Sequence, residues 1–353
     1  MTTIVHTADL HLRADDRDRL DGLEAVIETA RSHDAEVVTI GGDLFDRTDD
    51  VDELRPTLRN HYFTDQPFEV LLIPGNHDVE AFRDDLFFGD CCTVFAESEH
   101  FEMWRNADES ISIVAIPYQE AFTDDLVSAL DARSTTAETE ILLFHGSLDA
   151  PIGDNHGDET DYRYFPVTEG ELERLEFDYY LAGHYHDAYY RQFANGAEFA
   201  YPGTPVSTRT SETGRRQAVV LDPGNPLRFE ALATSHILEH QVMVAPGEEE
   251  STVSGIDSWV TENVTEEAIP RISVDGVVEI PEDRFVEELH CVAEADWIDH
   301  QWVSVDHIRN HPVIMDFENR LREQSWESDT ERAVWLRTLQ VASRVASSGT
   351  RWR

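Results

Sequence analysis

Five short apolar runs of this sequence each end in a small polar motif, and no other feature limits the possible folds as strongly. The runs are rich in β-branched and aromatic residues, which predicts strands buried on both faces. In chain order the pairs are residues 4–5 with Asp9-x-His11, residues 37–40 with Gly42-Asp43 through Asp46, residues 70–73 with Gly75-Asn76-His77-Asp78, residues 141–144 with His145-Gly146, and residues 179–182 with Gly183-His184-x-His186. Open α/β sheets place ligand sites at the carboxyl ends of their strands, so we expect these motifs to converge.

The motifs carry enough ligand atoms for two metal ions. They supply several carboxylates, the amide of Asn76 and five imidazoles. Two carboxylates, the amide and four imidazoles are enough to hold two ions, which leaves a fifth imidazole for catalysis. Any one of these motifs occurs by chance in a chain this rich in Asp and His, but all five in order after strands indicate a site.

This ordered set resembles the pattern of the calcineurin-like metallophosphoesterase superfamily over roughly residues 1–235. The resemblance implies a four-layer α/β/β/α sandwich. It also implies that one ion is held by Asp9, His11, Asp43 and His186, and that Asp43 bridges to a second ion held by Asn76, His145 and His184.

Ligation by imidazole, carboxylate and amide suits Mn²⁺, Zn²⁺ or Fe better than ions that prefer thiolates. We take Mn²⁺ as the first expectation, with Zn²⁺ and Fe as alternatives. Two such ions can bind the oxygens of a phosphoester and activate a water for in-line attack, so the expected reaction is hydrolysis.

His77 follows directly after the expected ligand Asn76. In the superfamily its counterpart stabilises the transition state or protonates the leaving oxygen, usually with a hydrogen bond to the counterpart of Asp46. A carboxylate partner would keep His77 protonated and oriented. Asp46 has an alternative role as a helix N-cap.

Three local segments resemble the SbcD-type exonuclease subunit of double-strand-break repair complexes. They are IVHTADLHL at residues 4–12, YPGTP at residues 201–205 and AIPRISVDGVV at residues 268–278. This resemblance implies an exonuclease or endonuclease that acts on DNA ends, a coiled-coil ABC-type ATPase partner and an optional homodimer. Arg13 departs from the family, whose members usually carry Gly there. The alternatives are a phosphodiesterase or phosphatase acting on nucleotides, cyclic diesters or phosphoproteins, and a non-catalytic assembly subunit, although no ligand is missing.

Four arginines are candidate contacts to substrate phosphate. Arg47 follows Asp46, as it does in the protein-phosphatase subgroup, where this Arg grips phosphate. Arg209, Arg215 and Arg216 cluster after the YPGTP segment and could contact a nucleic-acid backbone. The alternative in each case is an ordinary surface charge, at a helix start for Arg47 and at a hairpin turn for the cluster.

The charge balance indicates that the protein works at a high salt concentration. All 27 basic residues are Arg, against 72 Asp and Glu, which gives a formal net charge of -45. In a high-salt cytoplasm the Debye length falls to about 3 Å, which screens this self-repulsion. The hydrophobic content of 41% argues against disorder. No apolar run approaches the length of a membrane span, and the three cysteines suggest a reducing compartment.

The length predicts more than one domain. We expect a catalytic domain at residues 1–235, a small α/β cap at residues 236–310 and a helical tail at residues 311–353. A helix is expected within residues 16–32, and residues 194–196 and 213–214 are expected turns of hairpins that complete a second sheet. The tail spaces Phe317, Leu321, Val334, Leu336 and Leu339 as a helix does. It would dock the ATPase partner or pack on its own domain.

Overall fold

The computed structural model describes residues 2–82, 86–96, 99–134, 136–149 and 164–306, five single positions at 315, 316, 319, 320 and 323, and residues 328–347. The chain forms two compact units, residues 1–236 and residues 237–353, and each is described by itself. Phe317 and Leu321, which were expected in the helical tail, lie outside the described residues.

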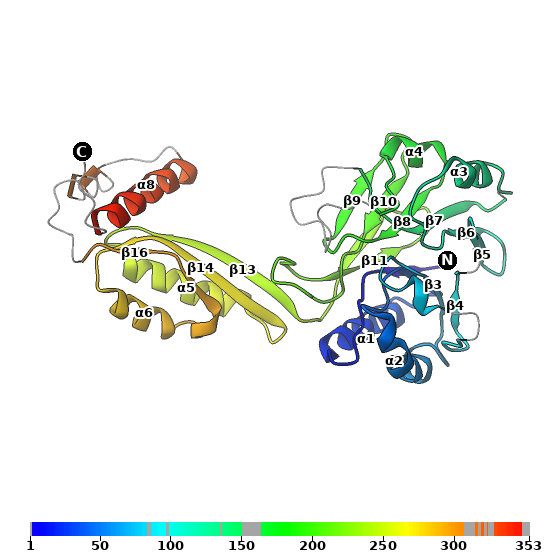
Figure 1. Ribbon diagram of the computed structural model, residues 1–353, viewed down its shortest axis with the longest axis horizontal. Coiled ribbons are helices and arrows are strands. Elements are labelled where there is room, and N and C mark those ends of the chain that lie inside the picture. The colour runs from blue at the N-terminus through cyan, green and yellow to red at the C-terminus, as the bar shows by residue number, and fades with distance from the viewer. Residues whose placement is uncertain are drawn as a thin grey trace. The chain divides into compact units, whose positions relative to one another are not determined.

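The first unit is built on two six-stranded sheets (Figure 1). The first sheet has the order β12 (Arg228–Ala231), β11 (Gln217–Leu221), β1 (Ile4–Thr7), β2 (Val37–Gly41), β3 (Glu69–Ile73) and β4 (Cys92–Val94). The second has the order β5 (Glu102–Arg105), β6 (Ile111–Ala115), β7 (Thr139–His145), β8 (Tyr179–Gly183), β10 (Glu198–Tyr201) and β9 (Tyr189–Gln192). Strands β1 to β4 are parallel, as are β6, β7, β8 and β10.

Alternate residues of the central strands serve two different cores. In β1, Ile4 points between the sheets, where it joins Leu143 and Leu181 of the second sheet. Val5 points the other way, toward Leu23 of the first helix. Because both faces are covered, these strands are apolar throughout instead of alternating with polar residues.

Helices cover the outer face of each sheet and complete an α/β/β/α sandwich, the fold class expected from the sequence. The first sheet is covered by α1 (Arg17–Ser32) and α2 (Val51–Thr57). The second sheet is covered by α3 (Asp124–Asp131) and α4 (Glu169–Arg174). The side chains of Thr123 and Thr168 cap the amino ends of α3 and α4, which fixes where these helices begin.

The hairpin prediction is correct for one turn and wrong for the other. Residues 194–196 join β9 and β10, which pair antiparallel at the edge of the second sheet. Thr213 and Gly214 lie instead in the long loop between β10 and β11, and β11 joins the first sheet beside β1. This loop therefore crosses from one sheet to the other, a connection that turn residues alone do not reveal.

The second unit is a small α/β layer with a helix of the chain's last part packed on it. Its strands are β13 (His236–Val244), β14 (Ala268–Val278), β15 (Ile298–His300) and β16 (Val303–Ser304), and its helices are α5 (Glu249–Asn263), α6 (Glu282–His290) and α8 (Asp329–Ser347). Leu336 and Leu339 of α8 are fully buried, and α8 contacts β14 and β16. The tail helix thus packs on its own unit, while Val334 stays 59% exposed.

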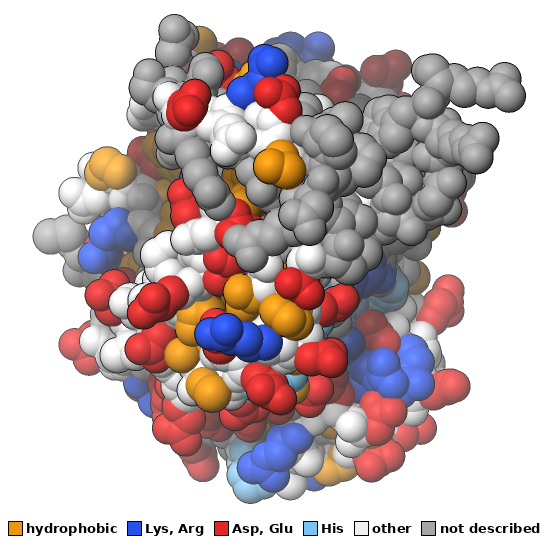
Figure 2. All heavy atoms as spheres, turned by 90° about the vertical axis from the view of Figure 1, so that its left-hand side faces the viewer, with side chains coloured by type: hydrophobic (Ala, Val, Ile, Leu, Met, Phe, Trp, Pro, Cys, Tyr) orange, Lys and Arg blue, Asp and Glu red, His pale blue; other side chains and the backbone are white. Residues whose placement is uncertain are grey.

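Acidic side chains are widespread on the face of the molecule drawn in Figure 2, where blue arginines are scattered among the red carboxylates. In the part of the chain that the structure describes, no helix combines the length and the apolar character that crossing a membrane requires.

Candidate metal centre

The five polar motifs meet in the first unit, on loops that leave the carboxyl ends of β1, β2, β3, β7 and β8. Backbone hydrogen bonds join the first two loops, from Asp9 N to Gly42 O (3.1 Å) and from His11 N to Asp43 O (2.9 Å). The backbone N–H of His184 donates to both carboxylate oxygens of Asp9 at 3.0 Å, which ties the two sheets together. The loops therefore hold one another in a fixed geometry.

Four of the converging residues adopt a backbone conformation that L-residues seldom adopt. The φ angle is 54° at Asp9, 46° at His11, 51° at Asp43 and 115° at His184. Each such residue costs about 1–3 kcal/mol, which the surrounding packing must offset. Strain of this kind tends to gather at functional sites, and here it lies in three of the five motifs.

Two glycines are required because side chains of the site approach them closely. A Cβ atom on Gly42, whose φ is 98°, would lie 2.3 Å from Nδ1 of His145. A Cβ atom on Gly75 would lie 2.1 Å from Oδ1 of Asp43. The glycines of the second and third motifs thus make room for the side chains that gather there.

The ligand atoms form overlapping groups. Asp9, His11 and His186 place their ligand atoms within 4.8 Å of one another, as do Asp9, Asp43 and His145. Oδ2 of Asp43 lies 3.8 Å from Nε2 of His11 and 3.3 Å from Nε2 of His145, so this carboxylate lies between the two groups.

The remaining expected ligands border the group around His145. The amide oxygen of Asn76 lies 3.0 Å from Nε2 of His145, and the ring of His184 lies 5.4 Å from the ring of His145. The structure thus brings together all seven residues that the sequence singled out as metal ligands.

Hydrogen bonds on the far side of two imidazoles leave lone pairs in the site. Nδ1 of His186 donates to Glu212 Oε1 (2.7 Å), and Nδ1 of His145 donates to Gly41 O (2.8 Å). In the neutral form of each ring, a proton on Nδ1 leaves the lone pair on Nε2, the form in which an imidazole binds a metal ion. Nε2 of His186 lies 3.1 Å from Nε2 of His11, and Nε2 of His145 faces carboxylate and amide oxygens. Both Nε2 atoms thus lie among other potential ligand atoms of the site.

The pKa shifts of two buried residues indicate that the carboxylates of the site favour nearby positive charge. Burial, together with the nearby Asp43 carboxylate, raises the pKa of Asp9 to about 6. Burial opposes a charge on His145, yet the Asp43 carboxylate raises the pKa of His145 to about 9. A divalent cation bound there would supply the positive charge that these buried carboxylates favour. The donor set fits a divalent metal ion.

His77 and Asp46 do not form the pair expected from the resemblance. The backbone N–H of His77 donates to Oδ1 of Asp43 (2.9 Å), and its ring packs edge-on against that of His11 at 4.8 Å. Asp46 lies 3.5 Å from Nδ1 of His11 and 3.3 Å from Nη1 of Arg19. Among the described residues, no hydrogen bond joins His77 to Asp46, and the Asp46 carboxylate instead faces Nδ1 of His11 and the guanidinium of Arg19. Asp46 is not a helix cap either, since the helical segment that follows is preceded by Arg47 and has no side-chain cap.

The four candidate arginines lie in different environments. Arg47 is half exposed beside the site, and its guanidinium binds Asp50. Arg209 and Arg215 are exposed on the loop between β10 and β11. Arg216 is buried, and it donates to the carbonyl oxygens of Thr204 (2.9 Å) and His186. The expectation of a surface cluster is therefore wrong for Arg216, because its donors are used to hold the backbone of a metal-site loop.

Two supporting residues escaped the sequence analysis, and a third, Asp78, belongs to a motif that the sequence singled out. Glu212 orients His186, and nothing local in the sequence signals this contact across 26 positions. Arg19 donates to His11 O (2.5 Å) and shares the buried face of α1 with Leu23, so a charged residue in register with apolar ones was an available signal. Asp78 is buried and accepts from Gly75 N and Phe45 N, which joins the second and third loops.

We expect Glu212→Gln to weaken metal binding by about 10–100-fold, because loss of the carboxylate makes Nε2 of His186 a poorer ligand. Glu212 holds His186 from a buried position, and the hydrogen bond from His186 lowers the pKa of Glu212 to about 2 despite burial. Calorimetric titration of the metal-free protein with Mn²⁺ measures the effect. Glu198→Gln is the matched control, since Glu198 is also buried but accepts from Leu227 N. An unchanged affinity in Glu212→Gln contradicts this role.

A model of known protein families, described as calcineurin-like phosphoesterase, matches residues 2–188, which hold all five motifs. The chain belongs to the calcineurin-like phosphoesterase family. Its metal-binding character and its α/β sandwich agree with that membership. Membership implies a metal-dependent hydrolase.

Two curated relatives are each 25% identical to the phosphoesterase. One is the uncharacterized metallophosphoesterase YhaO of Bacillus subtilis (strain 168), matched over 240 residues, 60% of this chain and 55% of the relative. The other is the DNA double-strand break repair protein Mre11 of Aeropyrum pernix, matched over 269 residues, 68% of this chain and 60% of the relative. The chain thus spans little more than half the length of the relatives that it matches.

Among solved structures, a dimetal phosphatase from Danio rerio superposes with a TM-score of 0.46 at 12% identity. The superposition covers 65% of this chain and 96% of that one.

Proposed function

We propose that this phosphoesterase hydrolyses phosphodiester bonds of DNA at a two-metal site and works as a repair nuclease on DNA ends. The observation that carries the hydrolytic part is the position of Asp43, whose carboxylate lies between two groups of buried imidazoles. The DNA part is supported by similarity to Mre11 of Aeropyrum pernix, which extends over 269 residues and so beyond the segment matched by the family model.

Asp9, His11, Asp43 and His186 would hold one ion, and Asp43, Asn76, His145 and His184 the other, with Mn²⁺ as the proposed metal. Divalent ions in such a site polarise the phosphoryl oxygens and activate the attacking water. The set is complete in this chain, which argues against a non-catalytic subunit.

The protein's own side chains position the reaction. Glu212 and the carbonyl of Gly41 fix the orientation of His186 and His145. His77 is half-buried at the same site and is held through its backbone by Asp43. We assign it the transfer of a proton to the leaving oxygen, since it need not bind metal to reach the site.

Hydrolysis of linear duplex DNA tests the proposal against its alternatives. The purified protein is assayed with Mn²⁺ in high-salt buffer on linear DNA, on bis(p-nitrophenyl) phosphate and on p-nitrophenyl phosphate. We propose high salt because it screens the self-repulsion of a chain with a net charge of -45 most strongly. We expect cleavage of DNA and of the diester. Turnover of the diester without DNA cleavage would indicate a small-molecule phosphodiesterase, and turnover of the monoester alone a phosphatase.

A further inference from the structure

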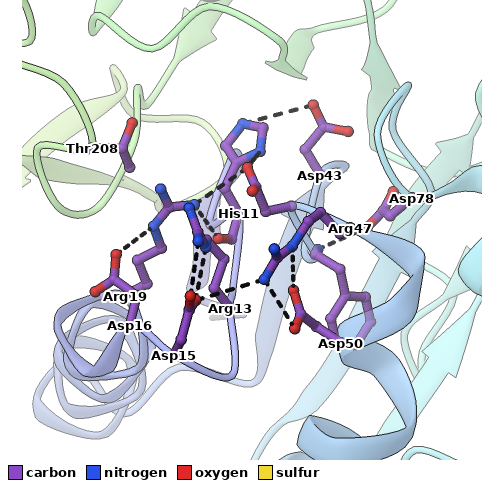
Figure 3. Close-up of polar contacts among 12 residues, drawn as sticks. His11, Arg13, Asp15, Asp16, Arg19, Asp43, Arg47, Asp50, Asp78 and Thr208 are labelled. Carbon is purple, nitrogen blue, oxygen red and sulfur yellow. Dashed lines mark hydrogen bonds and ion pairs between the residues drawn. The ribbon is translucent and has the colours of Figure 1, made fainter.

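The loops that follow β1 and β2 continue side by side beyond the metal-site residues. Leu12 N donates to Leu44 O (2.8 Å), and Asp46 N donates to Leu12 O (3.2 Å). The next residues along these two loops are Arg13 and Arg47. Both are thus held at the rim of the site, two residues beyond His11 in one loop and four beyond Asp43 in the other (Figure 3).

Asp15 lies between the two guanidinium groups. Nε and Nη2 of Arg13 each donate to a carboxylate oxygen of Asp15 at 2.9 Å, which is a bidentate contact. Nη2 of Arg47 lies 3.6 Å from Oδ1 of Asp15 (Figure 3). A bidentate arginine with a second guanidinium beside the same anion is also an arrangement with which proteins bind phosphate.

Asp50 and Asp15, the acidic partners of the two arginines, differ in how exposed their side chains are. The side chain of Asp50 is 10% exposed and grips Nε and Nη2 of Arg47, so it fixes the direction of that side chain. The side chain of Asp15 is 62% exposed on a turn. Exposed ion pairs contribute little to stability, so an incoming anion can displace Asp15 while Asp50 continues to hold Arg47.

We propose that Arg13 and Arg47 form a subsite for a second phosphate, one that neighbours the scissile phosphate in a nucleotide chain, and that Asp15 occupies its anion position in the free protein. The inference rests on the proposed function and adds a determinant of substrate choice to it. A substrate with one phosphate leaves this subsite to Asp15, whereas a chain of nucleotides displaces Asp15 and gains the contacts of both arginines. The carboxylate thus competes with the substrate, and its removal strengthens binding.

Two substrates separate the subsite from the metal centre. Oligothymidylate has neighbouring phosphates, whereas thymidine 5′-(p-nitrophenyl phosphate) has only the scissile diester. We expect Arg13→Gln and Arg47→Gln each to raise KM for oligothymidylate about tenfold, because each variant loses charge-assisted hydrogen bonds to phosphate. KM for the mononucleotide ester should stay unchanged. All assays use one salt concentration, because phosphate contacts weaken as salt rises.

Asp15→Asn changes KM for oligothymidylate in the opposite direction. We expect about a threefold decrease, because the competing anion is gone. The matched control is Arg228→Gln. Arg228 forms a comparable exposed pair with Asp222, but it pairs with Val220 in the sheet, opposite the first residues of β1 and away from its carboxyl end. Arg228→Gln should leave KM for both substrates unchanged.

Three results overturn the subsite: an equal effect of Arg13→Gln on both substrates, no effect on either, or weaker oligothymidylate binding in Asp15→Asn. Failure of the proposed function gives a different result. In that case the unaltered protein neither cleaves fluorescein-labelled oligothymidylate nor binds it in an anisotropy titration, and the subsite is rejected with it. Normal cleavage by both the unaltered protein and Arg13→Gln rejects the subsite alone.

Discussion

Asp43→Asn should lose both bound metal ions and at least about a thousandfold of the phosphodiesterase activity. The carboxylate lies 3.3 Å from Nε2 of His145 and 3.8 Å from Nε2 of His11, so a neutral amide there weakens both groups of ligands at once. Bound metal ions contribute several kcal/mol to transition-state stabilisation, and about 4 kcal/mol corresponds to a thousandfold in rate. Metal content by mass spectrometry and turnover of bis(p-nitrophenyl) phosphate measure the two losses.

Asp52→Asn is the control for loss of one negative charge, since Asp52 is exposed on α2. It should keep its metal and its activity. Retention of one full equivalent of metal by Asp43→Asn would show that this carboxylate serves a single ion, and the bridging role would be withdrawn.

His77→Gln should lower kcat by about 10²–10⁴-fold and leave the metal content intact, as expected for loss of a general acid. The half-buried ring of His77 packs against that of His11, and its backbone N–H is bonded to Asp43. A glutamine keeps the backbone contact but cannot transfer the proton. Steady-state kinetics together with metal analysis separate the two effects.

His61→Gln is a matched histidine control, because His61 is exposed. A loss of metal from His77→Gln would contradict the assignment as a general acid. It would place His77 among the ligands instead, a role that the grouping of its ring with His11 and Asp43 also allows.

Local pattern predicted the frame of the first unit well. The apolar runs became β1, β2, β3, β7 and β8, and the expected helix within residues 16–32 is α1. Such runs are informative because a strand covered on both faces excludes polar residues along its whole length. Polar side chains then stand out where each strand ends, and the resemblance to the metallophosphoesterase pattern selected the ligands among them.

Contacts between distant parts of the chain were not predictable in this way. The loop between β10 and β11 crosses from one sheet to the other, and its path depends on the packing of both sheets. The contact of Glu212 with His186 depends on the same packing, because Glu212 lies in this loop. The burial of Arg216 has the same origin, because only the folded loop places carbonyl oxygens around its guanidinium. Asp46 turned toward His11 and Arg19 for a comparable reason: Arg19 comes from the next helix, whose rotation is set by its apolar face.

The two sheets contribute different numbers of ligands to the candidate metal centre. Asp9, His11, Asp43 and Asn76 follow strands of the first sheet, whereas His145, His184 and His186 follow strands of the second. A cation held by both sets would link the two halves of the sandwich. Its binding would then be thermodynamically coupled to the stability of the domain, because the free energy of binding would also oppose separation of the two sheets.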